Sequence, residues 1–180
     1  MIRACHLAAV LLSVAPLFGC HRAQSVSKGP DQRVEVYFSP GDQCTEAIVR
    51  EIGKARQSVH VQAYSFTSSA IARALTDAEE RGAKVVAILD ASNRTKHYSA
   101  ADFLAHEGVE TYIDSQHAIA HNKIIIIDGQ TILTGSFNFT KAAEDNNAEN
   151  LLVIHDAHIA AKYEQNWQSH FSHSEYYAGR

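Results

Sequence analysis

Residues 121–138 read HNKIIIIDGQTILTGSFN, and this stretch predicts both the local fold and the position of a site. Four consecutive isoleucines are typical of a strand that is buried on both faces of a sheet. Asp128-Gly129, between two apolar runs, is a turn signal. We therefore expect strands over 121–127 and 131–137, joined as a hairpin.

Polar side chains mark the open end of this hairpin. Because alternate residues of a strand point to the same side, His121 and Lys123 share one face. Ser136 and Asn138 share one face of the second strand for the same reason. We expect these four side chains to converge at one end of a sheet, on a support that the isoleucines anchor in the core.

The chain from Arg33 onward alternates between strand and helix patterns. Apolar residues recur at every second position in the strands and along one face of the helices. The expected strands also cover 34–38, 59–64, 84–89, 109–113 and 149–154, and the expected helices cover 43–55, 69–81, 100–106 and a segment that starts after Asp156 with the stripe Ile159, Tyr163, Trp167 and Phe171. This order predicts an α/β fold in which a mixed β-sheet is flanked by helices on both faces.

The spacing of the site residues, H-x-K-x4-D-x6-G-S-x-N, resembles the signature of the phospholipase D superfamily. Every defined position is present, and the resemblance extends over the chain from about Val34. It is strongest with the small bacterial endonucleases of the superfamily that carry a single motif. The resemblance implies the α-β sandwich of phospholipase D-like nucleases and a covalent phosphohistidine at His121.

The motif residues have side chains suited to hydrolysis of a phosphodiester. Neutral imidazole is a nucleophile near pH 7, which suits His121. Lys123 and Asn138 would stabilise the non-bridging phosphate oxygens, and Ser136 would orient that cluster. Glu149 lies in a segment similar to the one that presents an acid in this family, and would hold the second nitrogen of His121. The alternatives are structural: a hydrogen-bonded core histidine, a strand lysine, a turn serine and a surface acid.

Two other motif positions and one loop are interpreted differently. Asp128 precedes Gly129 and lies several strand positions from His121, so we interpret it as a turn-forming, structural residue. Gly135 belongs to the structural part of the motif. The loop that contains Arg94 and Lys96 is basic and could contact the backbone phosphates of a substrate.

Eleven histidines raise the question of a metal. His155 with His158, and His170 with His173, are spaced so that each pair could share a helix face. Neither pair has a cysteine or carboxylate nearby with the spacing of a ligand set. We therefore expect exposed histidines, no metal site, no cofactor and a metal-independent reaction.

The single motif predicts a homodimer. Displacement at phosphorus needs a nucleophile and an acid for the leaving oxygen, and one histidine cannot serve as both while bound to phosphorus. Superfamily members with two motifs supply one histidine from each, whereas this chain has no internal repeat. Two chains related by a twofold axis would bring both copies of His121 and Lys123 to one site.

The first residues differ in composition from the rest. Arg3 followed by the apolar run 7–18 predicts a signal peptide over 1–19, and 20–32 reads as a linker before a domain over 33–180. Leu17-Phe18-Gly19-Cys20 resembles a lipobox, so Cys20 is either a lipidated membrane anchor or an ordinary residue of an exported chain. A buried first helix is the remaining alternative. We expect a periplasmic or secreted protein.

Cys44 depends on the fate of Cys20. If Cys20 carries lipid, Cys44 is a small buried hydrophobe on a predicted helix. If it does not, a Cys20–Cys44 disulfide could form in an oxidising compartment. The sequence leaves both alternatives open.

Length and charge limit the functions. A chain of 180 residues suits one compact domain, and a net charge of -4 lacks the basic excess of most nucleic-acid binders. An endonuclease of low sequence specificity, acting on DNA or RNA, would therefore need a local basic site. The competing interpretations are a phospholipase D that acts on lipid head groups and a non-catalytic binding module.

Overall fold

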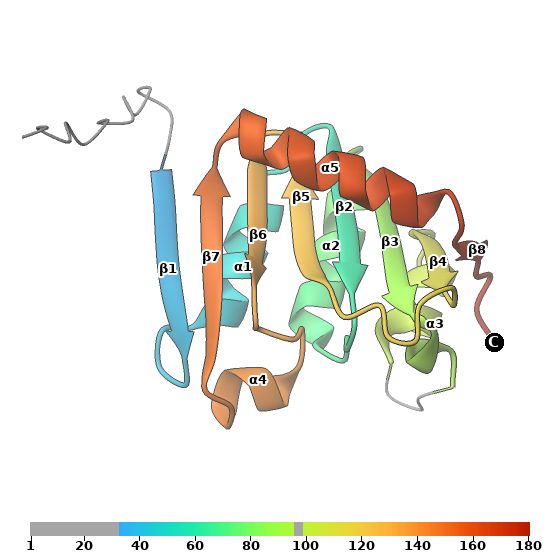
Figure 1. Ribbon diagram of the computed structural model, residues 1–180, viewed down its shortest axis with the longest axis horizontal. Helices are drawn as coiled ribbons and strands as arrows, with labels where there is room; N and C mark the ends of the chain where they lie inside the picture. The colour runs from blue at the N-terminus through green and yellow to red at the C-terminus, as the bar shows by residue number, and fades with distance from the viewer. Residues whose placement is uncertain (1–32, 96–98) are drawn as a thin grey trace, which may run out of the picture.

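The computed structural model describes residues 33–95 and 99–180, in which one mixed sheet runs through the molecule (Figure 1). The sheet has the strand order β1-β7-β6-β5-β2-β3-β4-β8. Its strands are β1 (Arg33–Ser39), β2 (Ser58–Ala63), β3 (Lys84–Asp90), β4 (Glu110–Asp114), β5 (Lys123–Ile127), β6 (Thr131–Gly135), β7 (Glu149–His155) and β8 (Glu175–Tyr176). Strand β3 pairs in parallel with both β2 and β4, and the other pairs are antiparallel. The predicted mixed sheet is confirmed.

Helices cover both faces of the sheet, as the sequence predicts. Helix α5 (Ala157–Phe171) crosses one face, while α1 (Cys44–Ile52) and α2 (Ser69–Glu80) lie behind the other (Figure 1). Helix α3 (Ala100–His106) contacts α2 and β4, and the short α4 (Lys141–Asp145) lies beyond the lower end of β6 and β7. Among the described residues, none of the helices has the length and apolar composition needed to cross a bilayer.

The four isoleucines of β5 connect the two layers. Ile124 and Ile126 belong to the apolar cluster under α5, whereas Ile125 and Ile127 belong to the larger core on the side of α1 and α2. This alternation explains why an unbroken apolar run forms a strand here, since both faces of β5 are buried. Trp167 of α5 fastens its helix to the sheet by donating a hydrogen bond from Nε1 to the Val61 carbonyl, at 2.9 Å.

The hairpin is shorter than the sequence predicts. Strand β5 begins at Lys123 instead of His121, and β6 ends at Gly135 instead of Phe137. The chain before β5 nevertheless stays beside β2, because the Tyr64 N–H donates to the Asn122 carbonyl. Three short elements were not predicted: a 3-10 turn η1 (Ala91–Arg94), α4 and β8.

Candidate active site

One end of the sheet carries a polar hollow of about 490 Å³. The end of β2, the start of β5, the end of β6 and the start of β7 meet there, because β5 and β6 each pair with neighbours running in the opposite direction. The hollow is lined by His121, Lys123, Gly135, Ser136, Asn138 and Glu149. The structure therefore brings together the predicted catalytic residues, although the last lies 28 positions after the first.

His121 is exposed at this hollow and Lys123 is buried beside it. The Lys123 Nζ donates to the His121 carbonyl at 2.7 Å, and its side chain is 7% exposed. Burial lowers the pKa of the Lys123 ammonium, and the negative charge of Glu149 acts in the opposite direction. A buried ammonium is an effective partner for a phosphate because little water screens its charge.

Tyr64 is a site residue that the sequence analysis missed. The centroid of its ring lies 4.6 Å from the centroid of the His121 ring. The Lys123 Nζ lies 5.1 Å from the same Tyr64 centroid. It supports the imidazole on one side and offers its π face to the ammonium. The available signal was its position directly after β2, next to the motif strand, but that adjacency depends on strand order.

Asn138 and Ser136 follow β6 and play different structural parts. The Asn138 Oδ1 is buried and has no hydrogen-bond partner among the described residues. The Ser136 Oγ accepts from the backbone N–H of Asn150 at 3.0 Å and from its side-chain amide at 3.3 Å. Ser136 thus ties the end of β6 to β7. The Oδ1 of Asn138 can only accept a hydrogen bond, so a phosphate oxygen would have to bind the Nδ2 donor of the same amide.

Gly135 makes this turn possible. Its φ is 150°, and a Cβ at this position would overlap the backbone carbonyl oxygen of Asn150. The motif glycine therefore permits close approach of β7 to the end of β6, where Ser136 points back to Asn150.

Glu149 lines the hollow without contacting His121. Its Oε1 accepts from the Asn147 side chain at 3.0 Å, and the described chain shows no hydrogen bond between Glu149 and His121. The expected pairing is therefore not formed in this structure, in which the carboxylate accepts from a neighbouring amide. Its influence on Lys123 is the electrostatic one described above.

Asp128 lies at the opposite end of β5 from His121. Its carboxylate accepts from the backbone N–H groups of Arg56, Gln57 and Ser58 at 2.8–3.2 Å. Its own φ is 52°, the left-handed conformation that the turn before Gly129 requires. These contacts join the hairpin turn to the start of β2.

A family model described as "Cardiolipin synthase, PLD-like domain" matches residues 48–171, which contain the whole hollow. The chain belongs to the phospholipase D superfamily. The family that the 121–138 motif predicts is thereby confirmed. Membership, together with the intact motif, makes the chain a phosphodiesterase of this superfamily.

Relatives of two kinds resemble this phospholipase D superfamily chain. A protein of Rickettsia bellii named phospholipase D is 43% identical over 145 residues, covering 81% of this chain and 72% of that protein. The solved structure of Nuc from Salmonella typhimurium, a phospholipase D family member, has a TM-score of 0.78 and 36% identity, and covers 81% of this chain and 98% of Nuc. NucT from Helicobacter pylori has a TM-score of 0.76 and 26% identity, covering 81% and 99%.

The predicted basic loop is described in part. Arg94 donates to the Glu175 carboxylate at 2.8 Å and lies over the Tyr177 ring, while Lys96 lies outside the described residues. A substrate phosphate at Arg94 would have to compete with Glu175.

Cys44 is fully buried on α1, and burial raises the pKa of its thiol to about 11. The signal peptide, the linker and Cys20 lie outside the described residues.

The prediction of exposed histidines is wrong for three of the four paired positions. His158 is exposed, but His155 is half-buried and its ring bonds to Thr131 at 3.0 Å. His170 and His173 are half-buried around Asp114, a residue 56 positions before His170. The carboxylate partner was missed because it comes from a strand that is distant in the sequence.

Proposed function

We propose that this phosphodiesterase is an endonuclease of low sequence specificity that cleaves DNA, with RNA as a second polymer of the same backbone chemistry. The observation that best supports this proposal is the similarity to Nuc. The match covers 98% of the Nuc chain at 36% identity. The polar, open hollow supports the proposal because a phosphate in a polymer backbone can enter it from the side. No divalent cation is assigned to the reaction, since Lys123 supplies the positive charge.

His121 is the proposed nucleophile. A neutral ring nitrogen attacks phosphorus, the N–P bond forms, and the bond to the leaving oxygen breaks as that oxygen takes a proton. Water then attacks the phosphohistidine, and the N–P bond breaks to release the phosphate monoester end. Lys123 and the Asn138 amide stabilise the charge on the non-bridging oxygens in both steps.

A second copy of the chain is the proposed source of the proton. One hollow contains one histidine, His121, which is occupied during the covalent step. In a twofold dimer the partner's copy of this imidazole protonates the leaving oxygen and later activates the water. Two copies of Lys123 would also concentrate positive charge locally in a chain whose net charge is -4.

Phospholipase D activity on lipid head groups is the second candidate. The 43% identity to the Rickettsia bellii protein named phospholipase D favours it. A lipid-linked Cys20 would place the site next to a membrane, in a periplasmic or secreted protein. We rank it second because no aliphatic side chain among the described residues lines the hollow to pack against acyl chains.

Incubation of the purified protein with plasmid DNA and, separately, with phosphatidylcholine vesicles tests the two candidates. Both reactions contain EDTA, and circular dichroism of the same sample separates loss of fold from loss of chemistry. We expect nicked and linear plasmid, no release of choline, and no product with His121→Ala. Choline release without DNA cleavage would favour the second candidate, and recovery that required Mg²⁺ would contradict metal-independent chemistry.

A further inference from the structure

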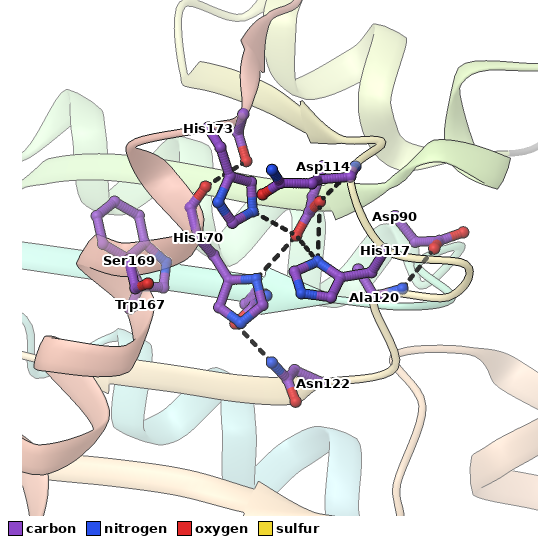
Figure 2. A network of polar contacts seen from close by, with 12 residues as sticks. Asp90, Asp114, His117, Ala120, Asn122, Trp167, Ser169, His170 and His173 are labelled. Atoms are coloured by element: carbon purple, nitrogen blue, oxygen red, sulfur yellow. Dashed lines mark hydrogen bonds and ion pairs between the residues drawn. The ribbon is translucent and has the colours of Figure 1, made fainter.

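Four metal-ligating side chains converge outside the hollow, on the side of the sheet that α5 covers (Figure 2). The Asp114 cluster, as we name it, consists of Asp114, His117, His170 and His173. Asp114 is the last residue of β4, and His117 follows it in the loop that leads to the motif. The other two histidines come from the last turn of α5 and the residues after it.

The spacing of the cluster suits a small cation. All of its ligand atoms lie within 4.8 Å of one another. The Asp114 carboxylate lies 2.8 Å from the His170 Nδ1, 3.3 Å from the His117 Nδ1 and 3.4 Å from the His173 Nε2. A tetrahedral ion with bonds of roughly 2.0–2.1 Å places its donor atoms about 3.3 Å apart.

The cluster gathers three imidazoles around one carboxylate, which also accepts from the Gln116 N–H at 3.1 Å. The Asp114 side chain is fully buried, and all of its ion pairs within the described residues are to histidines. The His173 Nε2 is buried, and its 3.4 Å contact with the Asp114 carboxylate lacks hydrogen-bond geometry. Neighbouring imidazole rings lie 4.9–5.4 Å apart and tilted by 41–66°, so they surround the carboxylate instead of stacking.

A second group of acidic and histidine side chains differs from the Asp114 cluster in the cations that surround it. Glu35, Glu51 and His155 also lie within 4.8 Å of one another. Arg33 donates to His155 and pairs with Glu35 at 2.9 Å, and Arg50 and Lys54 pair with Glu51. These cations already neutralise the carboxylates and would repel a metal. Within residues 33–95 and 99–180, by contrast, no lysine or arginine pairs with Asp114.

We propose that the Asp114 cluster binds one divalent transition-metal ion, with zinc as the preferred ion. Three imidazoles and one carboxylate match the nitrogen-rich, four-coordinate sites of zinc, whereas Mg²⁺ and Ca²⁺ prefer oxygen ligands. The buried aspartate supplies the charge, and half-exposed His117 leaves a path for entry. None of the four ligands lines the hollow, so the ion takes no part in the phosphate chemistry.

The bound ion would fix the segment that carries the nucleophile. His117 and Asp114 are joined by a short loop, and His121 lies four residues further on. The same segment is held at Ala120, whose N–H donates to the Asp90 carboxylate at 2.8 Å. The side-chain amide of Asn122, the residue between the motif histidine and lysine, donates to the Gln62 Oε1 at 2.9 Å. The site is therefore structural, and it is independent of which phosphodiester the hollow accepts.

Zinc binding by untagged, EDTA-treated and desalted protein tests this proposal. We expect calorimetric titration with ZnCl₂ to give one ion per chain, and Tm to rise with zinc, because an ion that binds only the folded state stabilises it. CoCl₂ should produce the visible absorption of a tetrahedral cobalt site. MgCl₂ should give no heat of binding and no change in Tm.

Variants locate the ion. His117→Ala and His173→Ala remove ligands that are partly exposed, and each should weaken zinc binding by more than the roughly 10- to 100-fold seen for outer-shell changes. His158→Ala on the exposed part of α5 and His121→Ala in the hollow are matched controls that should leave zinc affinity unchanged. The proposal is overturned by absence of zinc binding, by normal affinity in both ligand variants, or by loss of binding in His121→Ala.

Discussion

The polar residues at the two ends of strand β5 differ in their hydrogen bonding. At one end, the Asp128 carboxylate accepts hydrogen bonds from three backbone N–H groups of the 56–58 segment. At the other end, the exposed His121 ring has no hydrogen bond, and the Asn138 Oδ1 is buried without a partner, among the residues described. Both ends belong to one sequence motif, and β5 between them is buried on both faces.

The difference separates structure from chemistry within the motif. A satisfied polar group holds its neighbours in place, and removing it costs stability. A group left without partners costs stability in the resting protein and persists where a substrate can use it. The contacts therefore assign Asp128 to the scaffold, and the opposite end is where we propose the reaction takes place.

The largest expected effect is at the unsatisfied end. His121→Ala should reduce turnover of plasmid DNA to less than about one per cent of wild type, because loss of a covalent nucleophile raises the barrier by several kcal/mol. Its Tm should change little, since the ring is exposed. His158→Ala on α5 is the control for removal of an exposed histidine. Residual turnover of ten per cent or more would exclude His121 as the nucleophile.

The opposite result is expected at the satisfied end. Asp128→Ala should lower the free energy of unfolding by about 2 kcal/mol, because three backbone donors lose a charged acceptor. Activity per folded molecule should be kept. Urea unfolding measures the change. Asp145→Ala, which removes a surface carboxylate paired with Lys141, is the control. Unchanged stability with lost turnover would reverse the assignment of the two ends.

A mixed dimer of wild-type and variant chains tests whether a second chain supplies part of the site at the His121 end of β5. Co-refolding equal amounts of wild type and His121→Ala gives about one quarter wild-type dimers by random pairing. If both imidazoles serve one phosphate, activity should fall to about one quarter of that from the same total of wild-type protein. Independent chains would retain about one half. Differently tagged chains verify the exchange.

The smallest expected effect is a shift in pH dependence. The charge of Glu149 raises the pKa of Lys123, against the lowering by burial. Glu149→Gln removes that charge, so the pKa of Lys123 falls further and the ammonium is lost at lower pH. The alkaline limb of the activity profile should therefore move to lower pH, with Asp145→Asn as the control. An unchanged limb, or a move to higher pH, would show that Glu149 does not act through Lys123.

Local patterns determined much of the protein. The isoleucine run, the Asp128-Gly129 turn and the alternation of elements indicated the mixed sheet, and the spacing of the motif indicated the family. The strand ends were placed less well: β5 starts at Lys123 because the two residues before it follow the end of β2 without continuing the ladder. Apolar periodicity reports burial, and it carries little information at the ends of an element.

Contacts between distant segments were decided only by the tertiary structure. Tyr64 joins His121 because β2 and β5 are neighbours in the strand order, and Asn150 binds Ser136 because β7 pairs with β6. Asp114 meets His170 because α5 crosses the sheet and ends beside β4. A sequence shows which side chains can bind or react, whereas strand order and helix crossing decide which of them meet, since those contacts arise from burial of the whole sheet rather than from local spacing.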